Sequence, residues 1–156
     1  MSKRIIAMLA GALAIAVVVG CGGGSDSSSD SSSLTKAEFI KQADAICAKG
    51  GELLNKEVED FGEENDIDPN KTTKEQQEEL ITEIVAANVQ SQVDEIRTLG
   101  APSGDEAQVE TMLDTVEEGV EELESKPNLF LNKKTNPLTR GSDLADKYGL
   151  KVCGQE

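Results

Sequence analysis

The side chains with the most chemical potential in this chain are 30 aspartates and glutamates and three cysteines. The chain has no histidine, so it lacks the usual general base near neutral pH and the commonest zinc ligand. Pairs of carboxylates can hydrolyse glycosides, but sugar sites use aromatic side chains for stacking, and this chain has only three phenylalanines and one tyrosine. We therefore expect no enzyme and no cofactor, and a carboxylate-based hydrolase is the least favoured alternative.

Asp66, Asp68 and Asn70 stand at alternate positions, like the opening ligands of a calcium-binding loop. Such a loop needs glycine at its sixth position and a bidentate glutamate at its twelfth, where this chain has Lys71 and Gln77. These three residues are therefore a weak calcium candidate, and we predict no metal site. The favoured interpretation is an acidic connection between helices, in which Asp and Asn provide turn chemistry.

Cys21 ends a short apolar run near the start of the chain. Lys3 and Arg4 form a positive segment, residues 5–19 are apolar, and the run closes on Val18-Val19-Gly20 immediately before the cysteine. This pattern resembles the lipobox of bacterial lipoproteins, in which the cysteine carries a diacylglyceryl group and becomes the first residue after cleavage. The resemblance implies that residues 1–20 are a signal peptide. It also implies an exported protein whose lipid anchors it to the outer face of the cell membrane.

Two other interpretations of the N-terminus remain open. An uncleaved membrane anchor is disfavoured because the apolar stretch is shorter than the run of about 18 to 20 residues that crosses a bilayer. A plain secretory signal would leave Cys21 as a free thiol. Residues 21–33 continue as a glycine- and serine-rich tract. This composition predicts a flexible tether whose typical span is about 20 Å and whose fully extended length is roughly 40 Å.

An odd number of cysteines in an exported protein needs an explanation, and a lipid on Cys21 provides one. Cys47 and Cys153 then remain as an even pair in an oxidising compartment, which favours a disulfide. Such a bond would close a loop of about 100 residues, for which the chain-entropy model gives about 4.7 kcal/mol of stabilisation. The alternative is two buried free thiols.

Apolar positions recur at helical spacing within residues 34–156, which predicts one helical domain. A first helix is expected to begin at Thr35, which stands in capping-box relation to Glu38. Gly50 and Gly51 interrupt the apolar face of this helix. Adjacent glycines weaken a helix, so the pair indicates either a close helix crossing or a break.

Further capping boxes are expected where Thr72 precedes Glu75, with the helix starting near Thr72 or Thr73, and where Ser103 precedes Glu106. They predict a second helix that runs to residue 99 and a third that follows the short link at residues 100–103 as its antiparallel neighbour. A shorter helix is expected to begin at Asn136-Pro137 and to end at Gly149. Because no alternating strand pattern competes, we predict an all-α bundle of three main helices and a shorter C-terminal helix, closed by one disulfide.

Asn88 and Gln92 lie on or beside the apolar stripe of the second expected helix. Polar side chains at such positions either form hydrogen bonds within the bundle or line a ligand cavity. Hydrogen bonding is the favoured interpretation because buried polar groups nearly always have partners. A cavity lined by these two residues would instead indicate that the protein binds a small ligand.

The chain is strongly acidic, with a formal net charge of −15. Cleavage after residue 20 would remove two positive charges, those of Lys3 and Arg4, and no negative one, so the mature chain would carry −17. A surface of this sign repels nucleic acid and anionic headgroups and attracts cationic partners. We therefore expect no nucleic-acid partner, and we expect membrane contact through the lipid on Cys21.

The segments at residues 39–47 and 148–154 each contain one of the paired cysteines. They resemble the ends of small actinobacterial-type exported lipoproteins, and this resemblance implies a disulfide-closed helical domain without catalytic residues. The expected function is therefore that of a membrane-anchored, non-enzymatic lipoprotein of the cell envelope. It would bind or interact with a small ligand or an envelope protein. The alternative is a structural or accessory envelope protein without a small ligand.

Overall fold

A computed structural model describes residues 33–155, which belong to one compact unit. The predicted signal peptide at residues 1–20, Cys21 and nearly all of the predicted tether lie outside the described residues. Within this described part the secondary structure is helical and contains no strand, which confirms the all-α prediction. No helix in the same part is long and apolar enough to cross a membrane.

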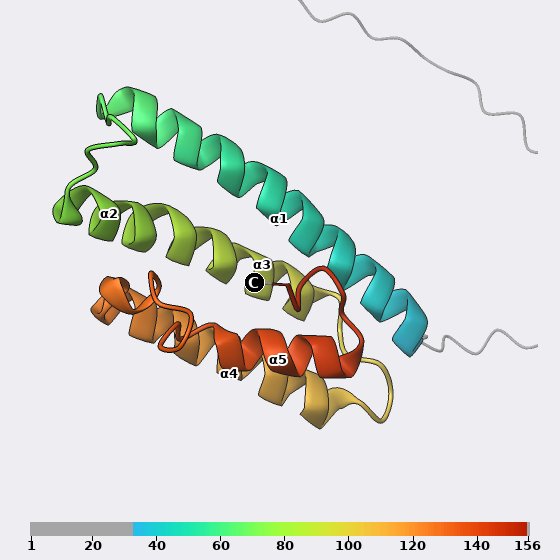
Figure 1. The fold of residues 1–156 in the computed structure, drawn as a ribbon. Helices are drawn as coiled ribbons and strands as arrows, with labels where there is room; N and C mark the ends of the chain where they lie inside the picture. Colours follow the sequence, from blue (N-terminus) through green and yellow to red (C-terminus); the bar gives the residue numbers. More distant parts are fainter. Residues whose placement is uncertain (1–32, 156) are drawn as a thin grey trace, which may run out of the picture. The chain divides into compact units, whose positions relative to one another are not determined.

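Three long helical stretches and one shorter helix form the bundle (Figure 1). The second stretch is continuous through a π-helical segment, in which the N–H of Ala86 donates to the carbonyl of Ile81. A short 3-10 helix follows the third long stretch. In chain order the elements are α1 (Lys36–Glu64), α2 (Lys74–Leu80), the π-helical segment η1 (Ile81–Val85), α3 (Ala86–Thr98), α4 (Glu106–Ser125), η2 (Pro127–Leu129) and α5 (Thr139–Tyr148).

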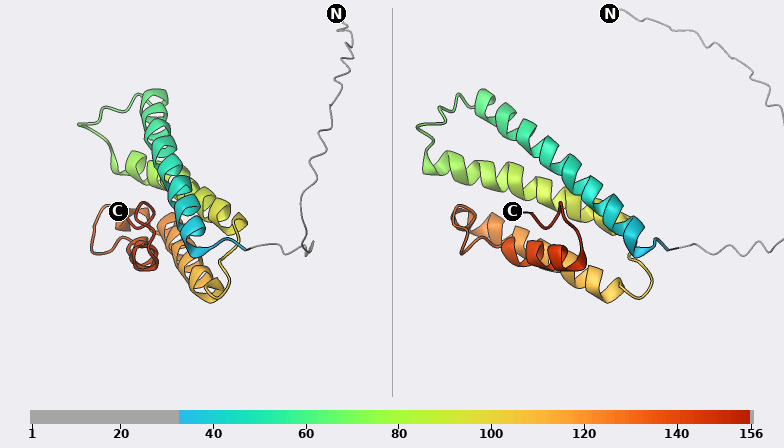
Figure 2. Two further views of the ribbon diagram at one scale, coloured as in Figure 1. Left: turned by 90° about the vertical axis from the view of Figure 1, so that its right-hand side faces the viewer. Right: turned by 45° about the vertical axis from the view of Figure 1, so that its right-hand side comes forward.

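The helices pack in the order α1 on α3, α3 on α4, and α4 on α5. Figures 1 and 2 show that the connection between α1 and α2 lies at one end of the bundle and the start of α1 at the other. The start of α1 is close to the connection between α3 and α4, where the hydroxyl oxygens of Ser33 and Ser103 are 2.7 Å apart. The C-terminal segment runs from the end of α5 back toward α1.

The first helix forms as the local sequence predicts. Thr35 is its N-cap, and the Thr35 and Glu38 side chains complete a capping box. The helix continues without a break through Gly50 and Gly51. A Cβ atom on Gly50 would overlap the side chain of Gln92 on α3, whereas one on Gly51 would meet no atom within 4 Å. The predicted break is therefore absent, and Gly50 lies where the Gln92 side chain of α3 packs against α1.

The second helical stretch begins at Thr73, one of the two predicted starts, but its capping box is not the predicted one. Thr73 is the N-cap of α2, and it forms the capping box with Gln76. The predicted partner Thr72 instead donates its hydroxyl to the carbonyl of Asp68, at 3.4 Å. Thr72 therefore closes the preceding turn rather than starting the helix.

The predicted capping box at Ser103 is wrong. Asp105 is the N-cap of α4, and no side chain forms a capping hydrogen bond there. The carboxylate of Asp105 is engaged by tertiary contacts, because it accepts the hydroxyl proton of Tyr148 at 2.8 Å and pairs with Lys36 at 3.4 Å. Glu106 accepts the N–H of Gly104 instead of that of Ser103.

The last helix begins at Thr139 and not at Asn136-Pro137 as expected. Asn136 forms a turn before the helix, since its side-chain oxygen accepts the N–H of Leu138 at 2.9 Å. The predicted end at Gly149 is confirmed. Gly149 has a φ of +120°, a conformation that favours glycine, and its N–H donates to the carbonyls of Ala145 and Asp146.

All buried apolar side chains of the core except Phe61 belong to two separate clusters. The larger cluster joins the first half of α1 to α3, α4 and α5, and it contains Phe39, Ala43, Val93, Ile96, Val109, Met112, Leu113, Ala145, Tyr148 and Leu150. The smaller cluster joins the π-helical segment to the second half of α4, and it contains Ile81, Val85, Ala86, Val120 and Leu123. The core is therefore divided along the length of the bundle.

Candidate functional site

A cavity of about 480 Å³ lies between the helices, and members of both apolar clusters line it. It opens to solvent, since its lining residues Ala48, Gly51 and Val152 are exposed. The lining includes Leu54 of α1, Val89 of α3, Val116 of α4 and Ala145 of α5. Phe130, which packs against the smaller cluster, adds the only described aromatic ring among the lining residues. Because the cavity draws on side chains of four helices, a ligand inside it would contact most of the bundle.

The lining is uncharged. None of the described residues that border the cavity is an aspartate, glutamate, lysine or arginine. Neutral polar side chains are present at four positions, namely Gln92, Asn136, Ser142 and Gln155. An apolar site of a few hundred Å³ with a small number of polar groups is typical of small-molecule binding. Because a buried charge without a partner is costly, this lining suits a neutral ligand with one or two hydrogen-bonding groups.

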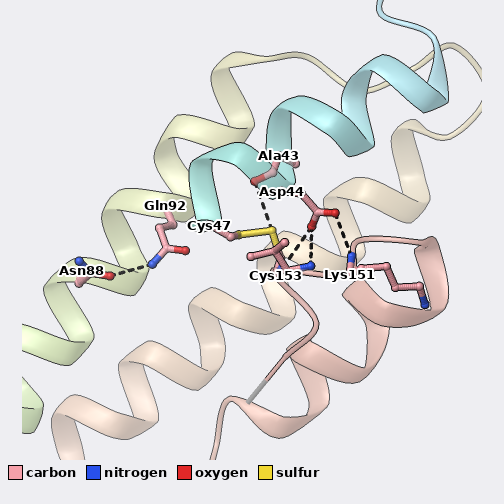
Figure 3. The surroundings of a disulfide bond; sticks show 8 residues. Ala43, Asp44, Cys47, Asn88, Gln92, Lys151 and Cys153 are labelled. Carbon is pink, nitrogen blue, oxygen red and sulfur yellow. Dashed lines mark hydrogen bonds between the residues drawn. A yellow bond between two sulfur atoms is a disulfide. The ribbon is translucent and has the colours of Figure 1, made fainter. Parts of the chain in front are cut away.

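The disulfide forms part of the cavity wall. Cys47 of α1 and Cys153 of the C-terminal segment are bonded, with an S–S distance of 2.05 Å and a Cα–Cα distance of 5.3 Å (Figure 3). This confirms the predicted pairing and excludes the alternative of two free thiols. The bond holds the C-terminal segment, including Val152, against the side of the cavity formed by α1.

Asp44 holds the same segment by hydrogen bonds. Its carboxylate accepts the backbone N–H groups of Lys151 at 3.0 Å, Val152 at 2.8 Å and Cys153 at 3.2 Å, as Figure 3 shows. Asp44 was not recognised in the sequence, because its partners lie more than 100 residues away and it belongs to no local motif. Together with the disulfide, it makes the C-terminal segment a fixed wall of the cavity.

Asn88 and Gln92 combine the two roles that the sequence left open. Gln92 donates to the side-chain oxygen of Asn88 at 2.7 Å (Figure 3), and Asn88 donates to the carbonyl of Gly50 at 3.2 Å and to the carboxylate of Glu57 at 3.4 Å. Asn88 is buried and does not belong to the lining, whereas Gln92 does. The pair therefore links α3 to α1 and also places one amide at the cavity.

The loop with the calcium candidates Asp66, Asp68 and Asn70 is a turn. Asp68 accepts the backbone N–H of Asn70 at 2.9 Å, and Lys71 lies 3.5 Å from its other oxygen. Asp66 has a φ of +50°, in the left-handed region that aspartate tolerates better than most residues. Among the described residues, no group of three or more histidine, cysteine, aspartate or glutamate side chains is placed to hold a metal ion.

Carboxyl groups with altered acidity lie away from the cavity. A hydrogen bond from Tyr148 and the nearby ammonium of Lys36 lower the pKa of Asp105. Burial, followed by the contact with Asp105, raises the pKa of Tyr148 above its ordinary value. Hydrogen bonds from Arg97 similarly lower the pKa of Glu117. Asp105 and Glu117 are thus held as carboxylates that stabilise the fold, which is the opposite of what a proton-donating catalytic acid needs.

The chain matches no family model, no curated protein and no solved structure with which it was compared. The chemistry of its own cavity is therefore the basis for assigning a function. Cys21, the predicted lipidation site, lies outside the described residues, and its lipid remains a prediction.

Proposed function

We propose that this protein is a lipid-anchored, non-enzymatic binding module of the cell envelope that holds a neutral, mainly apolar small molecule. The observation that carries the proposal is the cavity of about 480 Å³, whose described lining contains no charged side chain. Burial of apolar ligand surface against this lining would provide most of the affinity. Gln92, Ser142 and Asn136 would orient a polar group of the ligand.

The arrangement of the cavity supports a binder over a catalyst. Acid–base catalysis needs a titratable group within hydrogen-bond reach of the reacting atom. The described lining offers amides, one hydroxyl group and a disulfide instead. Such groups position a ligand, and they exchange no proton with it near neutral pH.

The anchor supports a role close to the membrane. The lipobox pattern ends at Cys21, and the predicted tether leads almost directly into α1 at Lys36. With a reach of at most roughly 40 Å, the tether would keep the cavity near the bilayer, where apolar molecules are concentrated. We therefore assign the protein to the outer face of the cell membrane, without a nucleic-acid partner.

Binding of a neutral fluorescent dye tests the proposal. Nile red is uncharged and brightens in apolar surroundings, so its titration reports occupancy of the cavity. Ala48 is an exposed lining residue of α1, and Ala48→Trp places a large ring at the cavity. Ala45 is exposed one turn earlier on the same helix but does not line the cavity, so Ala45→Trp is the matched control.

We expect the wild-type protein and Ala45→Trp to bind the dye equally, and Ala48→Trp to bind it at least about tenfold more weakly. Circular dichroism of all three proteins checks that the helical fold is retained. The proposal is wrong if the wild-type protein does not brighten the dye, or if both tryptophan variants weaken binding to the same extent.

A further inference from the structure

A second pocket lies where α1 is connected to α2. It has a volume of about 760 Å³ and is bordered by the end of α1, the connecting loop and the first turns of α2. Its apolar wall includes Phe61, Ile67 and Leu80, together with Val58, which is 37% exposed. This pocket shares none of its lining residues with the cavity described above. It is therefore a separate candidate site.

Carboxylates surround the apolar wall of this pocket. Glu59, Glu63, Asp66 and Asp68 all border it, and the described lining includes no lysine or arginine. Of these four, only Asp68 forms an ion pair within the described part of the chain, with Lys71. We call these residues, with the apolar wall, the acid-rimmed pocket.

The nearest lysine on α1 forms its ion pair with a carboxylate outside this rim. Lys56 contacts the carboxylate of Asp60, one helical turn further along, and that contact raises the pKa of the lysine. Asp60 does not border the pocket. Glu59, Glu63 and Asp66 are therefore exposed carboxylates that form no ion pair within the described residues. They lie beside the apolar wall of the pocket.

The acid-rimmed pocket is also remote from the point where the tether joins the domain. The tether enters at the N-terminus of α1, and the pocket lies at the C-terminal end of this 29-residue helix. At about 1.5 Å per residue, α1 separates the two by about 40 Å. The rim would repel anionic lipid headgroups, so its charge favours a protein partner over the membrane surface.

We propose that the acid-rimmed pocket binds a basic amphipathic peptide segment of a partner protein. Apolar side chains of the segment would cover Val58, Ile67 and Leu80, and its lysine or arginine side chains would pair with Glu59, Glu63 and Asp66. Complementary charge would also accelerate association with such a segment, since the whole chain carries a net charge of −15. This site is independent of the proposed small-molecule cavity.

Titration with a short dansyl-labelled peptide of leucine and lysine tests this assignment. The rim variant Glu59→Gln, Glu63→Gln, Asp66→Asn removes three negative charges, and asparagine tolerates the backbone conformation of Asp66. The control variant changes the overall charge by the same amount at exposed positions that do not border the pocket, namely Glu95→Gln, Glu110→Gln and Asp143→Asn.

We expect the rim variant to bind the peptide about tenfold more weakly than the wild-type protein, and the control variant to stay within about twofold, at low ionic strength. A peptide with serine in place of leucine should bind at least about tenfold more weakly to the wild-type protein. The assignment fails if the wild-type protein does not bind the leucine–lysine peptide, or if both variants weaken binding equally. It also fails if the serine peptide binds as tightly, because binding would then depend on charge alone.

Nile red binding to the rim variant separates this assignment from the proposed function. The dye should bind the rim variant as it binds the wild-type protein, since the two sites share no lining residue. Ala48→Trp should in turn leave peptide binding unchanged. Loss of peptide binding in Ala48→Trp would contradict two independent sites.

Discussion

Single carboxylates have distinct structural roles in this acidic chain. Asp44 fixes the C-terminal segment by accepting three backbone N–H groups. Asp105 accepts the hydroxyl proton of Tyr148, and the ammonium of Lys36 lies both near this carboxylate and 3.9 Å from the centre of the Tyr148 ring. These contacts join α1, the start of α4 and the end of α5. Most acidic residues look alike in the sequence, but Asp44 and Asp105 form specific contacts that hold the helices together.

The pair of Asp105 and Tyr148 predicts how stability changes in acid. The pKa of Asp105 is lower in the folded protein than in the unfolded chain. Ionised Asp105 therefore stabilises the fold above its ordinary pKa, and this stabilisation is lost as the pH falls through the pKa of the folded protein. Tyr148→Phe removes the largest cause of this shift. It should therefore lower the free energy of unfolding near neutral pH, and the difference from wild type should shrink between about pH 5 and pH 2. Urea unfolding at a series of pH values measures this.

Phenylalanine at position 148 keeps the edge-to-face contact with Phe39, whose ring centre is 5.9 Å from that of Tyr148. The variant therefore packs as the wild-type protein does, and the difference in stability between them measures the effect of the hydroxyl group alone. A stability difference that stays constant over the whole acid range would show that the hydrogen bond to Asp105 is not responsible.

Residues of the site differ in how far the sequence reveals them. Cys47 and Cys153 were identified by counting cysteines, which needs no knowledge of the fold. Gln92 was identified because a polar side chain beside an apolar stripe is unusual. Asp44 could not be identified, since an aspartate on an exposed helical face looks the same whether or not a distant segment returns to it.

At the scale of helices, local signals located most boundaries and tertiary contacts shifted the others. The Thr35 capping box and the end at Gly149 depend on neighbours within a few residues, and both were predicted. The start of α4 was not, because Asp105 and Ser103 make contacts with residues far along the chain. The π-helical segment Ile81–Val85 also gave no recognisable signal in the sequence.

The adjacent glycines of α1 predict opposite effects of the same substitution. Gly51→Ala should raise the free energy of unfolding by up to about 1 kcal/mol, because alanine favours the helix and meets no atom within 4 Å. Gly50→Ala should lower it, because the new methyl group displaces Gln92 and breaks its hydrogen bond to Asn88. Chemical denaturation of both variants measures the difference.

Each glycine variant serves as the control for the other, since the helix propensity gained is the same. Equal stabilisation by both substitutions would show that the Gln92 side chain moves away from Gly50 without a loss of stability. Loss of stability in both would point to a break in α1 at this position.

At the scale of the whole domain, the cavity results from a core divided into two clusters. Gly119 and Gly141 allow close approach of α4 to the segment that contains Pro137 and α5, since a Cβ on Gly119 would lie 2.8 Å from the carbonyl oxygen of Pro137. The number of helices and their order followed from periodicity. The cavity did not, because it depends on the distances between helices, which apolar spacing along one helix does not specify.

Removal of the disulfide should destabilise the domain as a whole. Cys47→Ala with Cys153→Ala opens a covalent loop that spans 106 residues, and the expected loss is about 2–5 kcal/mol of unfolding free energy. Thermal and urea unfolding measure it. A reducing agent should destabilise the wild-type protein similarly and leave the double variant unchanged. An unaltered midpoint of the wild-type protein after reduction would mean that the bond contributes no stability.

The central claim is that this protein is anchored by a lipid and holds a neutral ligand. The most direct test is to measure the mass of the intact protein after its release from the membranes of its native cells. Under denaturing conditions, the mass should equal that of residues 21–156 with a lipid on Cys21. Under native conditions, the same protein should carry an additional neutral mass, and Ala48→Trp should lack it. An unmodified Cys21 would contradict the anchor, and equal native and denatured masses of the wild-type protein would contradict the ligand.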